Sequence, residues 1–227
     1  MMTVSLVSHS TADVQMGLMS NLEKEKDLEN LVAYCARVSN PSNQHTVKTN
    51  NKLLKYLIQH KHWSPFEMVN VCLRVDTTRD IARQMLRHRS FSFQEFSQRY
   101  ADVSNLSDEF VYREARLQDE KNRQNSIETD DKELQKLWEE YQRDVLVSAK
   151  RAYNWALSNG IAKEQARVVL PEGLTISRLY VNGTLRSWIH YIELRSANGT
   201  QKEHIEIARE CAKVISDLFP YIQEVVQ

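Results

Sequence analysis

Glycine is scarce in this chain, with five residues among 227. No two of them are close enough to form the G-x-G-x-x-G turn of dinucleotide-binding domains or the glycine-rich loop that cradles phosphates in P-loop proteins. If the chain binds a nucleotide, side chains rather than glycine-rich backbone must hold its phosphates. The glycines are Gly17, Gly160, Gly173, Gly183 and Gly199.

Cysteine is also rare, and Cys35, Cys72 and Cys211 lie far apart among apolar neighbours. Their spacing suits neither a disulfide framework nor a zinc site, and it is typical of buried thiols in a reducing compartment. The thiols lack a basic neighbourhood and the serines lack the glycines of a nucleophile elbow, so no catalytic triad is indicated. If the protein is an enzyme, we expect a bound cofactor to carry out the difficult step.

The chain has no excess of either charge, because Lys+Arg and Asp+Glu both number 30. A general attraction to nucleic acid or to an anionic membrane is therefore not favoured, and any basic site must be local. No apolar run is long enough to span a bilayer, and the N-terminus lacks the pattern of a signal peptide. The sequence predicts a soluble, cytoplasmic protein with no metal.

Segments with the helical spacing of apolar residues alternate with segments that have the two-residue alternation of strands. This pattern predicts a single α+β domain over residues 1–227. Strands are predicted at 3–7, 69–75 and 174–181, and helices near 27–37, 79–88, 132–158, 163–170 and 184–194. Residues 101–131 are charged and irregular, and they are predicted to form a long loop or short helices.

Polar residues mark where two further helices and the helix at 79–88 begin. Asn50 or Asn51 is able to cap one helix, and Thr77 or Thr78 is able to cap the helix at 79–88. The segment Thr200-Gln-Lys-Glu203 has the pattern of a capping box, which predicts a last helix that ends at Pro220.

A basic and aromatic stretch runs from Gln84 to Tyr100. Arginine binds phosphates and carbonyls bidentately, and hydroxyls add neutral donors. Its phenylalanines indicate that it is held against a core, so we interpret it as a site for a phosphorylated ligand. Its polar members are Arg87, His88, Arg89, Arg99, Glu95, Ser92 and Ser97, and its phenylalanines are Phe91, Phe93 and Phe96.

Two alternatives compete with that interpretation. The stretch has features of a solvated, charged helix face that runs into a strand, since runs of charged residues are usually exposed to solvent. It also has the composition of a single-stranded RNA-binding module built on arginine and phenylalanine stacking, although the neutral net charge counts against this function.

The histidines outside this stretch give weaker signals. His60 and His62 flank Lys61, but no carboxylate or cysteine lies at ligand spacing, and His60 is predicted to be structural at a helix end. A cation near His190, at the end of the 184–194 helix, complements the helix dipole. His204 has no visible partner and is predicted to lie on the surface.

Five ordered motifs resemble the flavin-dependent thymidylate synthases. Arg87-His88-Arg89, seven residues and then Ser97 matches the family signature RHR-x7-S. The other matching segments are Ala36-Arg37-Val38-Ser39, His62-Trp-Ser-Pro-Phe-Glu67, Ala166-Arg167-Val-Val-Leu-Pro171 and Arg186 through Arg195. They occur in the family order from about residue 31 to 210, which makes the resemblance specific.

The resemblance implies a central twisted mixed or antiparallel sheet flanked by helices. It also implies a homotetramer whose active sites lie at subunit interfaces. The implied reaction is the reductive methylation of dUMP to dTMP, with 5,10-methylenetetrahydrofolate as carbon donor and hydride from FAD that NADPH re-reduces. The family does not depend on a cysteine nucleophile, which agrees with the cysteines of this chain.

The resemblance also assigns roles to residues. Arg195 would polarise a carbonyl of the pyrimidine, Arg99 and Arg167 would hold the phosphate, and positioning would dominate catalysis. The implied catalytic residues are Arg195, Ser97 and His62. The implied dUMP contacts are Gln84, Arg87, Glu95, Ser97, Arg99, Arg167 and Arg195. The implied FAD contacts are Ser39, His62, Arg87, His88, Arg89, Glu95, Thr184 and His190.

Two features depart from the family pattern. Many members have Asn where this chain has Thr184 and His190, so the flavin hydrogen bonds there differ. The segment Lys121-Asn-Arg-Gln124 is expected either to touch a cofactor or a neighbouring subunit, or to be a surface excursion.

Overall fold

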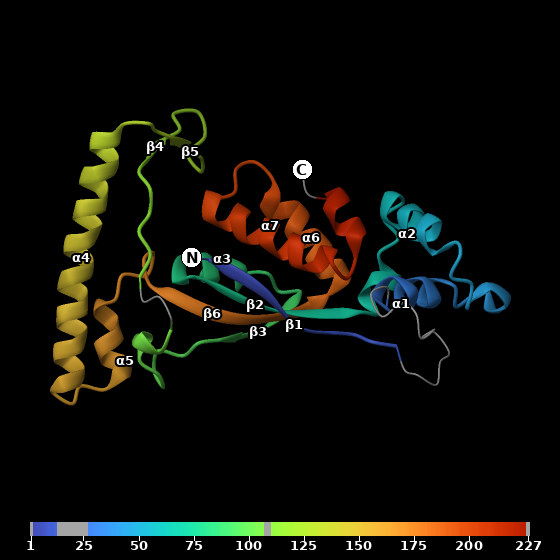
Figure 1. Cartoon of the computed structure of the whole chain (residues 1–227), viewed down its shortest axis with the longest axis horizontal. Helices are drawn as coiled ribbons and strands as arrows, with labels where there is room; N and C mark the ends of the chain where they lie inside the picture. The colour runs from blue at the N-terminus through green and yellow to red at the C-terminus, as the bar shows by residue number, and fades with distance from the viewer. Residues whose placement is uncertain (1, 13–26, 107–109, 226–227) are drawn as a thin grey trace.

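A four-stranded antiparallel sheet of order β1-β2-β6-β3 runs through the middle of the molecule (Figure 1). The computed structural model describes residues 2–12, 27–106 and 110–225. The strands are β1 (Thr3–His9), β2 (Asn70–Thr78), β3 (Phe91–Glu95) and β6 (Ile176–Thr184). The central pair, β2 and β6, is in register from Asn70 opposite Thr184 to Thr78 opposite Ile176. All three pairings are antiparallel, which confirms the antiparallel form of the expected sheet.

Helices α6 (Leu185–Ser196) and α7 (Lys202–Ser216) lie side by side over the sheet (Figure 1). The apolar face predicted for the first of them is buried, and Trp188 is fully enclosed. The Trp188 indole Nε1 donates to the carbonyl oxygen of Val71 on β2 at 2.9 Å. This bond fixes α6 against the strand whose alternating Val71, Leu73 and Val75 are fully buried.

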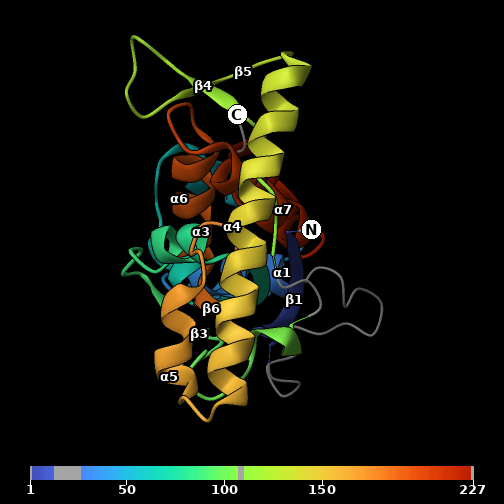
Figure 2. The same cartoon turned by 90° about the vertical axis from the view of Figure 1, so that its left-hand side faces the viewer.

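The remaining helices lie at the two ends of the sheet and beside it (Figures 1 and 2). Helices α1 (Asp27–Ala36) and α2 (Asn50–Gln59) pack together at one end, and α4 (Lys132–Ser158) with α5 (Lys163–Ala166) stands at the other. Helix α3 (Arg79–Met85) follows β2 directly. Short 3-10 turns are η3 (Pro41–Asn43), η4 (Ser64–Glu67), η5 (Val103–Asn105), η6 (Arg167–Val169) and η7 (Pro220–Val225).

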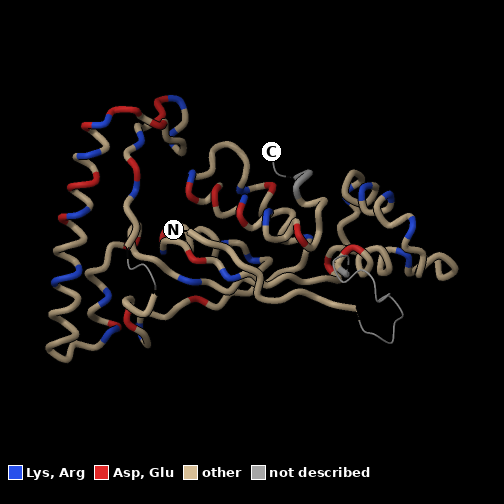
Figure 3. The backbone as a smooth tube through the Cα atoms, viewed as in Figure 1, with Lys and Arg blue, Asp and Glu red and all other residues tan. Residues whose placement is uncertain are grey.

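Helix α4 was correctly predicted from its apolar spacing, but many of its apolar side chains are uncovered in the single chain. Tyr141 is 67% exposed and Trp155 is 62% exposed. The other exposed apolar residues of α4 are Leu134, Leu137, Trp138, Val145 and Val147. Basic and acidic residues are mixed along the helix (Figure 3). An apolar stripe of this length marks an interaction surface rather than an ordinary monomer face.

Residues 101–131 contain a small hairpin that the sequence did not predict. Strands β4 (Arg116–Gln118) and β5 (Ser126–Glu128) pair antiparallel, and among the described residues of this segment only η5 is helical. Each strand has three residues and one apolar side chain, Leu117 or Ile127, so no alternation was available to indicate a strand. The prediction of a long loop or short helices is confirmed for most of the described residues of this segment, and it is wrong where the hairpin forms.

The predicted caps of two helices are also wrong. Helix α2 has Thr49 as its N-cap, because Asn50 is buried and binds Arg37 and Asn30 instead. Helix α7 has Gln201 as its N-cap rather than Thr200, so no capping box forms. Thr78 does occupy the N-cap of α3, although its hydroxyl donates to Asp80 Oδ1 rather than accepting from a backbone amide.

Gly183 on β6 lies opposite Phe91 and leaves room for that ring. A Cβ at residue 183 would clash with the Phe91 ring, which cannot retreat because it is buried against Trp188 at 4.6 Å between centroids. We predict that Gly183→Ala lowers the free energy of unfolding by about 1–3 kcal/mol, measured by urea denaturation.

Gly173→Ala is the matched control, because the nearest atom to its Cβ would be Asp80 Oδ2 at 4.0 Å. We expect the control to stay within about 0.5 kcal/mol of the wild type. The same loss of stability in both variants would contradict the packing argument.

Candidate active site

The stretch from Gln84 to Tyr100 crosses from the end of α3, through a turn, along β3 and into a second turn. Its first phenylalanine anchors it, because Phe91 is 9% exposed and also packs edge-on to Tyr191 at 5.8 Å. The prediction that aromatics hold the stretch against a core is confirmed. A stacking platform for RNA needs exposed ring faces, and Phe91 is turned inward.

The predicted site residues fall into three groups. The first group surrounds His88, whose Nε2 accepts a hydrogen bond of 2.9 Å from Arg195 Nε, 107 residues away along the chain. Gln84 joins the group through His204, whose ring lies 6.5 Å from that of His88. Tyr191 packs edge-on against the His88 ring at 5.0 Å.

The electrostatics of this group keep His88 neutral. Burial, followed by the nearby cations Arg195 and Arg87, lowers the pKa of His88 to about 4. A neutral imidazole has one acceptor nitrogen, and the bond from Arg195 identifies it as Nε2, so the proton is on Nδ1. His88 therefore orients the Arg195 guanidinium without adding charge.

The second group surrounds a cavity of about 370 Å³ between α3 and the segment from α5 to η6. Arg167 and Glu164 line it, and Arg99 reaches Glu164 at 3.3 Å. Its lining residues are Arg79, Arg83, Gln98, Glu164, Gln165, Arg167, Val168, Leu170 and Glu172. Burial lowers the pKa of Arg79, and the cations Arg83 and Arg167 lower it further against the opposing effect of Glu95.

Three residues of the stretch border this second group. Glu95 accepts from Ser177 Oγ at 2.8 Å and from Arg79 at 3.4 Å, so its carboxylate is already held. Ser97 Oγ accepts from the backbone N–H of Arg99 at 3.4 Å. The buried Gln98 Nε2 has no hydrogen-bond partner among the described residues, which leaves a donor beside the cavity.

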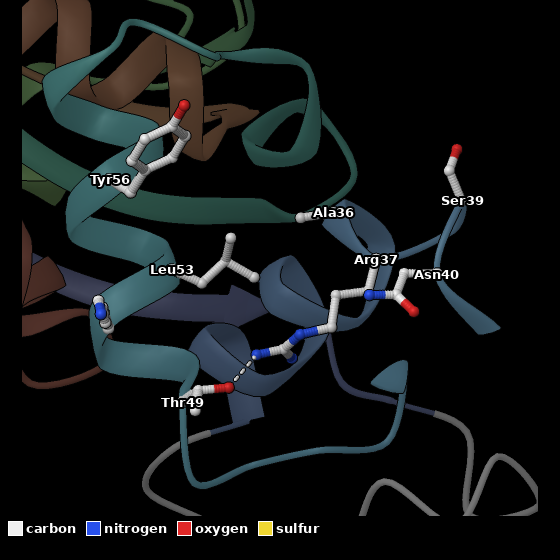
Figure 4. Close-up of a pocket in the computed structure, with 8 residues that line it drawn as sticks. Ala36, Arg37, Ser39, Asn40, Thr49, Leu53 and Tyr56 are labelled. Carbon is white, nitrogen blue, oxygen red and sulfur yellow. Dashed lines mark hydrogen bonds between the residues drawn. The ribbon is translucent and has the colours of Figure 1, made fainter. Parts of the chain in front are cut away.

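The third group lies between α1 and α2 and around η4. Ser39 borders a cavity of about 470 Å³ with Arg37 and Tyr56 (Figure 4). Arg37 is turned across the cavity to Thr49, at 3.1 Å. The Tyr56 ring lies 5.8 Å from that of His62. His190 of α6 packs on Trp63 at 4.8 Å, and burial lowers its pKa.

The remaining predicted FAD contacts lie at the edges of these groups. Arg87 and Arg89 are exposed and form no ion pair within the described part of the chain, so their charge is available to an anion. Thr184 is the N-cap of α6 and accepts from the backbone N–H of Ser187, so its hydroxyl already has a structural task. His60 is at the C-cap of α2, as predicted.

No hydrogen bond or ion pair between described residues joins the first group to the second. Arg83 points to Glu172 beside the cavity, whereas Gln84 points to Gln201 of the α7 N-cap. The predicted dUMP contacts are therefore divided between two faces of α3. Within the described part of one chain, no contact of this kind links the two sets to each other.

Sequence reasoning missed several residues of the site, and it placed His204 wrongly. His204 is completely buried rather than on the surface, and it binds Gln84 and Tyr191. Its signal was its position among Ile207, Ala208 and Cys211 on one face of α7, all of which are buried. Arg79 had a signal in the four-residue spacing of Arg79, Arg83 and Arg87, but Gln98 and Tyr191 had none.

Other kinds of site are not indicated by the described residues. No cluster of three His, Cys, Asp or Glu side chains suited to a metal occurs within 2–12, 27–106 and 110–225. The helices in that part of the chain include none that is both long and apolar enough to cross a membrane. Burial raises the pKa of Cys35, Cys72 and Cys211, which makes each a poor nucleophile.

The fold and the site define an α+β protein whose arginine-lined cavity is suited to an anionic ligand. Residues 21–221 match the family model described as thymidylate synthase complementing protein. A probable flavin-dependent thymidylate synthase of Paramecium bursaria Chlorella virus 1 is 52% identical over 194 residues, covering 86% of this chain and 88% of that protein. The flavin-dependent thymidylate synthase of Synechocystis sp. is 48% identical over 194 residues, covering 86% and 87%.

A solved structure agrees with these relatives. A UMP/dUMP methylase, PolB, from Streptomyces cacaoi, bound with 5-Br dUMP, is similar with a TM-score of 0.78 and 26% identity. The match covers 99% of this chain and 93% of that one. The chain belongs to the family of flavin-dependent thymidylate synthases.

The partly buried His88 and the fully buried His204 predict acid sensitivity. Folding lowers the pKa of His88 from 6.5 to about 4, and burial followed by Arg195 and His88 lowers that of His204 to about 3. The unfolded chain therefore binds more protons in this window, and stability must fall as the pH falls below 6.5. We predict a falling urea midpoint from pH 6.5 down to about 4.

Histidine ring signals in NMR spectra give the direct measurement. Of the seven histidines, His88 and His204 should stay unprotonated down to about pH 4. His45→Gln is the control for the urea experiment, because this residue is exposed, and we expect it to leave the pH dependence of stability unchanged. Titration of the His204 ring near 6.5 would contradict the assignment.

Proposed function

We propose that the three groups of residues assemble into an active site that methylates dUMP to dTMP. Flavin-dependent thymidylate synthase activity follows from the family to which the chain belongs. The carbon donor is 5,10-methylenetetrahydrofolate. When bound, FAD supplies the hydride for the reductive methylation and NADPH re-reduces it. The observation that carries this assignment is the direct bond between His88 and Arg195, which unites two distant family motifs.

Arg195 is the residue proposed to activate the pyrimidine. His88 accepts from its Nε, which holds the guanidinium plane and leaves the terminal amino groups for a substrate carbonyl. A fixed cation beside that oxygen stabilises the negative charge that develops as the ring is alkylated. The low pKa of His88 keeps the imidazole a neutral acceptor, so His88 orients Arg195 without adding a second charge of its own.

The cavity of the second group is proposed to hold the dUMP phosphate. Arg99 and Arg167 supply the charge, and the Gln98 Nε2 supplies a buried donor that no described residue satisfies. Glu164 pairs with Arg99 in this structure, so the phosphate would replace that exposed carboxylate. Ser97 and Glu95 lie at the border of the cavity and complete the dUMP contacts.

The arginines at the α3–β3 turn fit the pyrophosphate of FAD. Arg87 and Arg89 carry exposed charge without a described ion-pair partner, which suits an anionic cofactor. Ser39, His62 and His190 lie toward α1 and η4, where the cavity beside Arg37 offers space for the rest of the cofactor. Thr184 contributes through its position at the start of α6 rather than through a free hydroxyl.

Assembly of several chains is proposed to complete the site, with a homotetramer as the expected form. The dUMP contacts on the two faces of α3 are brought together only if one chain supplies Arg99 and Arg167 and another supplies Gln84 and Arg195. The uncovered apolar stripe of α4 offers the surface on which chains associate. We also propose a cytoplasmic location, which is consistent with the three free thiols.

The role of Arg195 is tested by Arg195→Ala. Loss of a fixed transition-state cation should reduce kcat for dTMP formation by about 10²–10³-fold. FAD binding, measured by the absorbance of the purified protein, should be retained. Arg209→Ala is the matched control, since Arg209 is an exposed arginine of α7. Near-normal dTMP formation by the Arg195→Ala variant would refute the assignment.

Sharing of residues between chains is tested by mixing two inactive variants. Arg167→Ala and Arg195→Ala should each form little dTMP alone. If they lie in the same site but come from different chains, exchange of subunits creates some sites with both arginines intact. Activity should then reappear in the mixture. Continued inactivity, with exchange verified by mass spectrometry of the mixed oligomers, would show that one chain supplies both arginines.

A further inference from the structure

A buried line of hydrogen bonds runs behind Gln84 from α6 to the start of α7. It begins at the Tyr191 hydroxyl, which lies 3.1 Å from His204 Nε2. His204 Nδ1 lies 3.1 Å from Gln84 Oε1, and Gln84 Nε2 donates to Gln201 Oε1 at 2.8 Å. Gln201 Nε2 then donates to Glu203 Oε2 at 2.9 Å.

The carboxylate of Glu203 sets the direction of the whole line. A carboxylate only accepts, so Gln201 must present its amide NH₂ to Glu203 and its oxygen to Gln84. Gln84 must then present its own NH₂ to Gln201 and its oxygen to His204. Because an amide oxygen only accepts, the proton of neutral His204 is on Nδ1, and Nε2 accepts from the Tyr191 hydroxyl.

The line ends at Glu203, which carries a negative charge. Glu203 is buried, and its carboxylate Oε1 lies 2.7 Å from Arg116 Nη2 and 3.1 Å from Arg113 Nη1. Burial acts to raise the pKa of Glu203, but the arginines and the bond from Gln201 lower it overall. Arg116 belongs to β4, so the hairpin near the start of α7 supports this end of the line (Figure 2).

The line leaves Gln84 with one defined orientation. Its oxygen and one of its N–H groups are bound from behind, while the second N–H and the second oxygen lone pair are free for a ligand. Without His204, the Gln84 oxygen loses its donor and the carboxamide is held only by its bond to Gln201, so its position becomes less fixed. A ligand that needs a donor at one point and an acceptor at another would then be held less well.

We propose that His204 is a positioning residue that fixes the carboxamide of Gln84 for dUMP. This inference rests on the proposed contact between Gln84 and dUMP. The competing explanation is that His204 only fills the core, since it is completely buried next to Tyr191. The two explanations differ in what happens when the volume is kept but the donor is lost.

The test compares His204→Leu with His204→Asn in the assembled, FAD-loaded enzyme. Leucine keeps most of the side-chain volume but removes the donor. The Asn Nδ2, in contrast, reproduces the donor position of the histidine Nδ1. We expect His204→Leu to raise both the KM and the Kd for dUMP by roughly tenfold, the value of one hydrogen bond. The kcat at saturating dUMP and the affinity for FAD should change by less than about threefold. His204→Asn should restore most of the dUMP affinity.

A double-mutant cycle with Gln84→Leu separates positioning from packing. If His204 acts through Gln84, then His204→Leu should have no further effect on the Kd for dUMP once Gln84 is leucine. Gln201→Leu loosens the same carboxamide from the other side and should also raise the Kd for dUMP. It serves as the equivalent variant if His204→Leu does not fold. The exposed His45→Leu is the matched control.

Several outcomes would overturn the inference. Wild-type dUMP affinity in His204→Leu, or in Gln201→Leu where the first variant does not fold, would do so. Equal losses for dUMP and FAD that Asn does not rescue would show a packing role. Additive effects in the cycle would show that His204 acts independently of Gln84. Failure of the wild type itself to bind dUMP would refute the proposed function instead, so the two failures are distinguishable.

Discussion

The geometry of the site depends on the burial of one ring, that of Phe91. The ring lies between Trp188 and the bare backbone of Gly183, and it fixes the start of β3 immediately after the Arg87-His88-Arg89 turn. Three arginines or histidines in a row would otherwise gain more from water than from any fixed position. Hydrophobic packing on one side of the chain therefore holds the charges on the other side where a ligand can use them.

The same packing explains why the histidines near Arg195 are neutral. His88 and His204 lose hydration beside the aromatic cluster of Tyr191, and the arginine cation further disfavours their protonation. Neutral imidazoles accept and donate at defined atoms, so Arg195 and Gln84 are oriented without competing charge. A charged arginine oriented by neutral hydrogen-bond partners is an arrangement suited to carbonyl polarisation.

Much of the fold could be predicted from the sequence, because β2, α4 and α6 have strong apolar periods. The β4–β5 hairpin could not, since Leu117 and Ile127 are single exposed apolar residues in three-residue strands. The composition of the Arg87–Arg99 stretch predicted an anion site. The RHR-x7-S resemblance predicted which ligands bind there, dUMP and FAD. The burial of His204 was missed because it depends on hydrogen bonds to distant partners. Gln84 and Tyr191 are 120 and 13 residues away along the chain.

A site that needs more than one chain, as proposed above, has a physical consequence for the whole enzyme. Exposed arginines that lie close together repel one another. Exposure of the aromatic residues on α4 to water is also unfavourable. In the proposed assembly, association would bury these aromatic residues, and an anionic ligand shared between chains would neutralise the arginines of each. A ligand that binds only the assembled form must stabilise that form in proportion to its affinity. In the proposed assembly, ligand binding and association would therefore be thermodynamically linked, and the dUMP contacts predicted on the two sides of α3 would be the structural origin of the link.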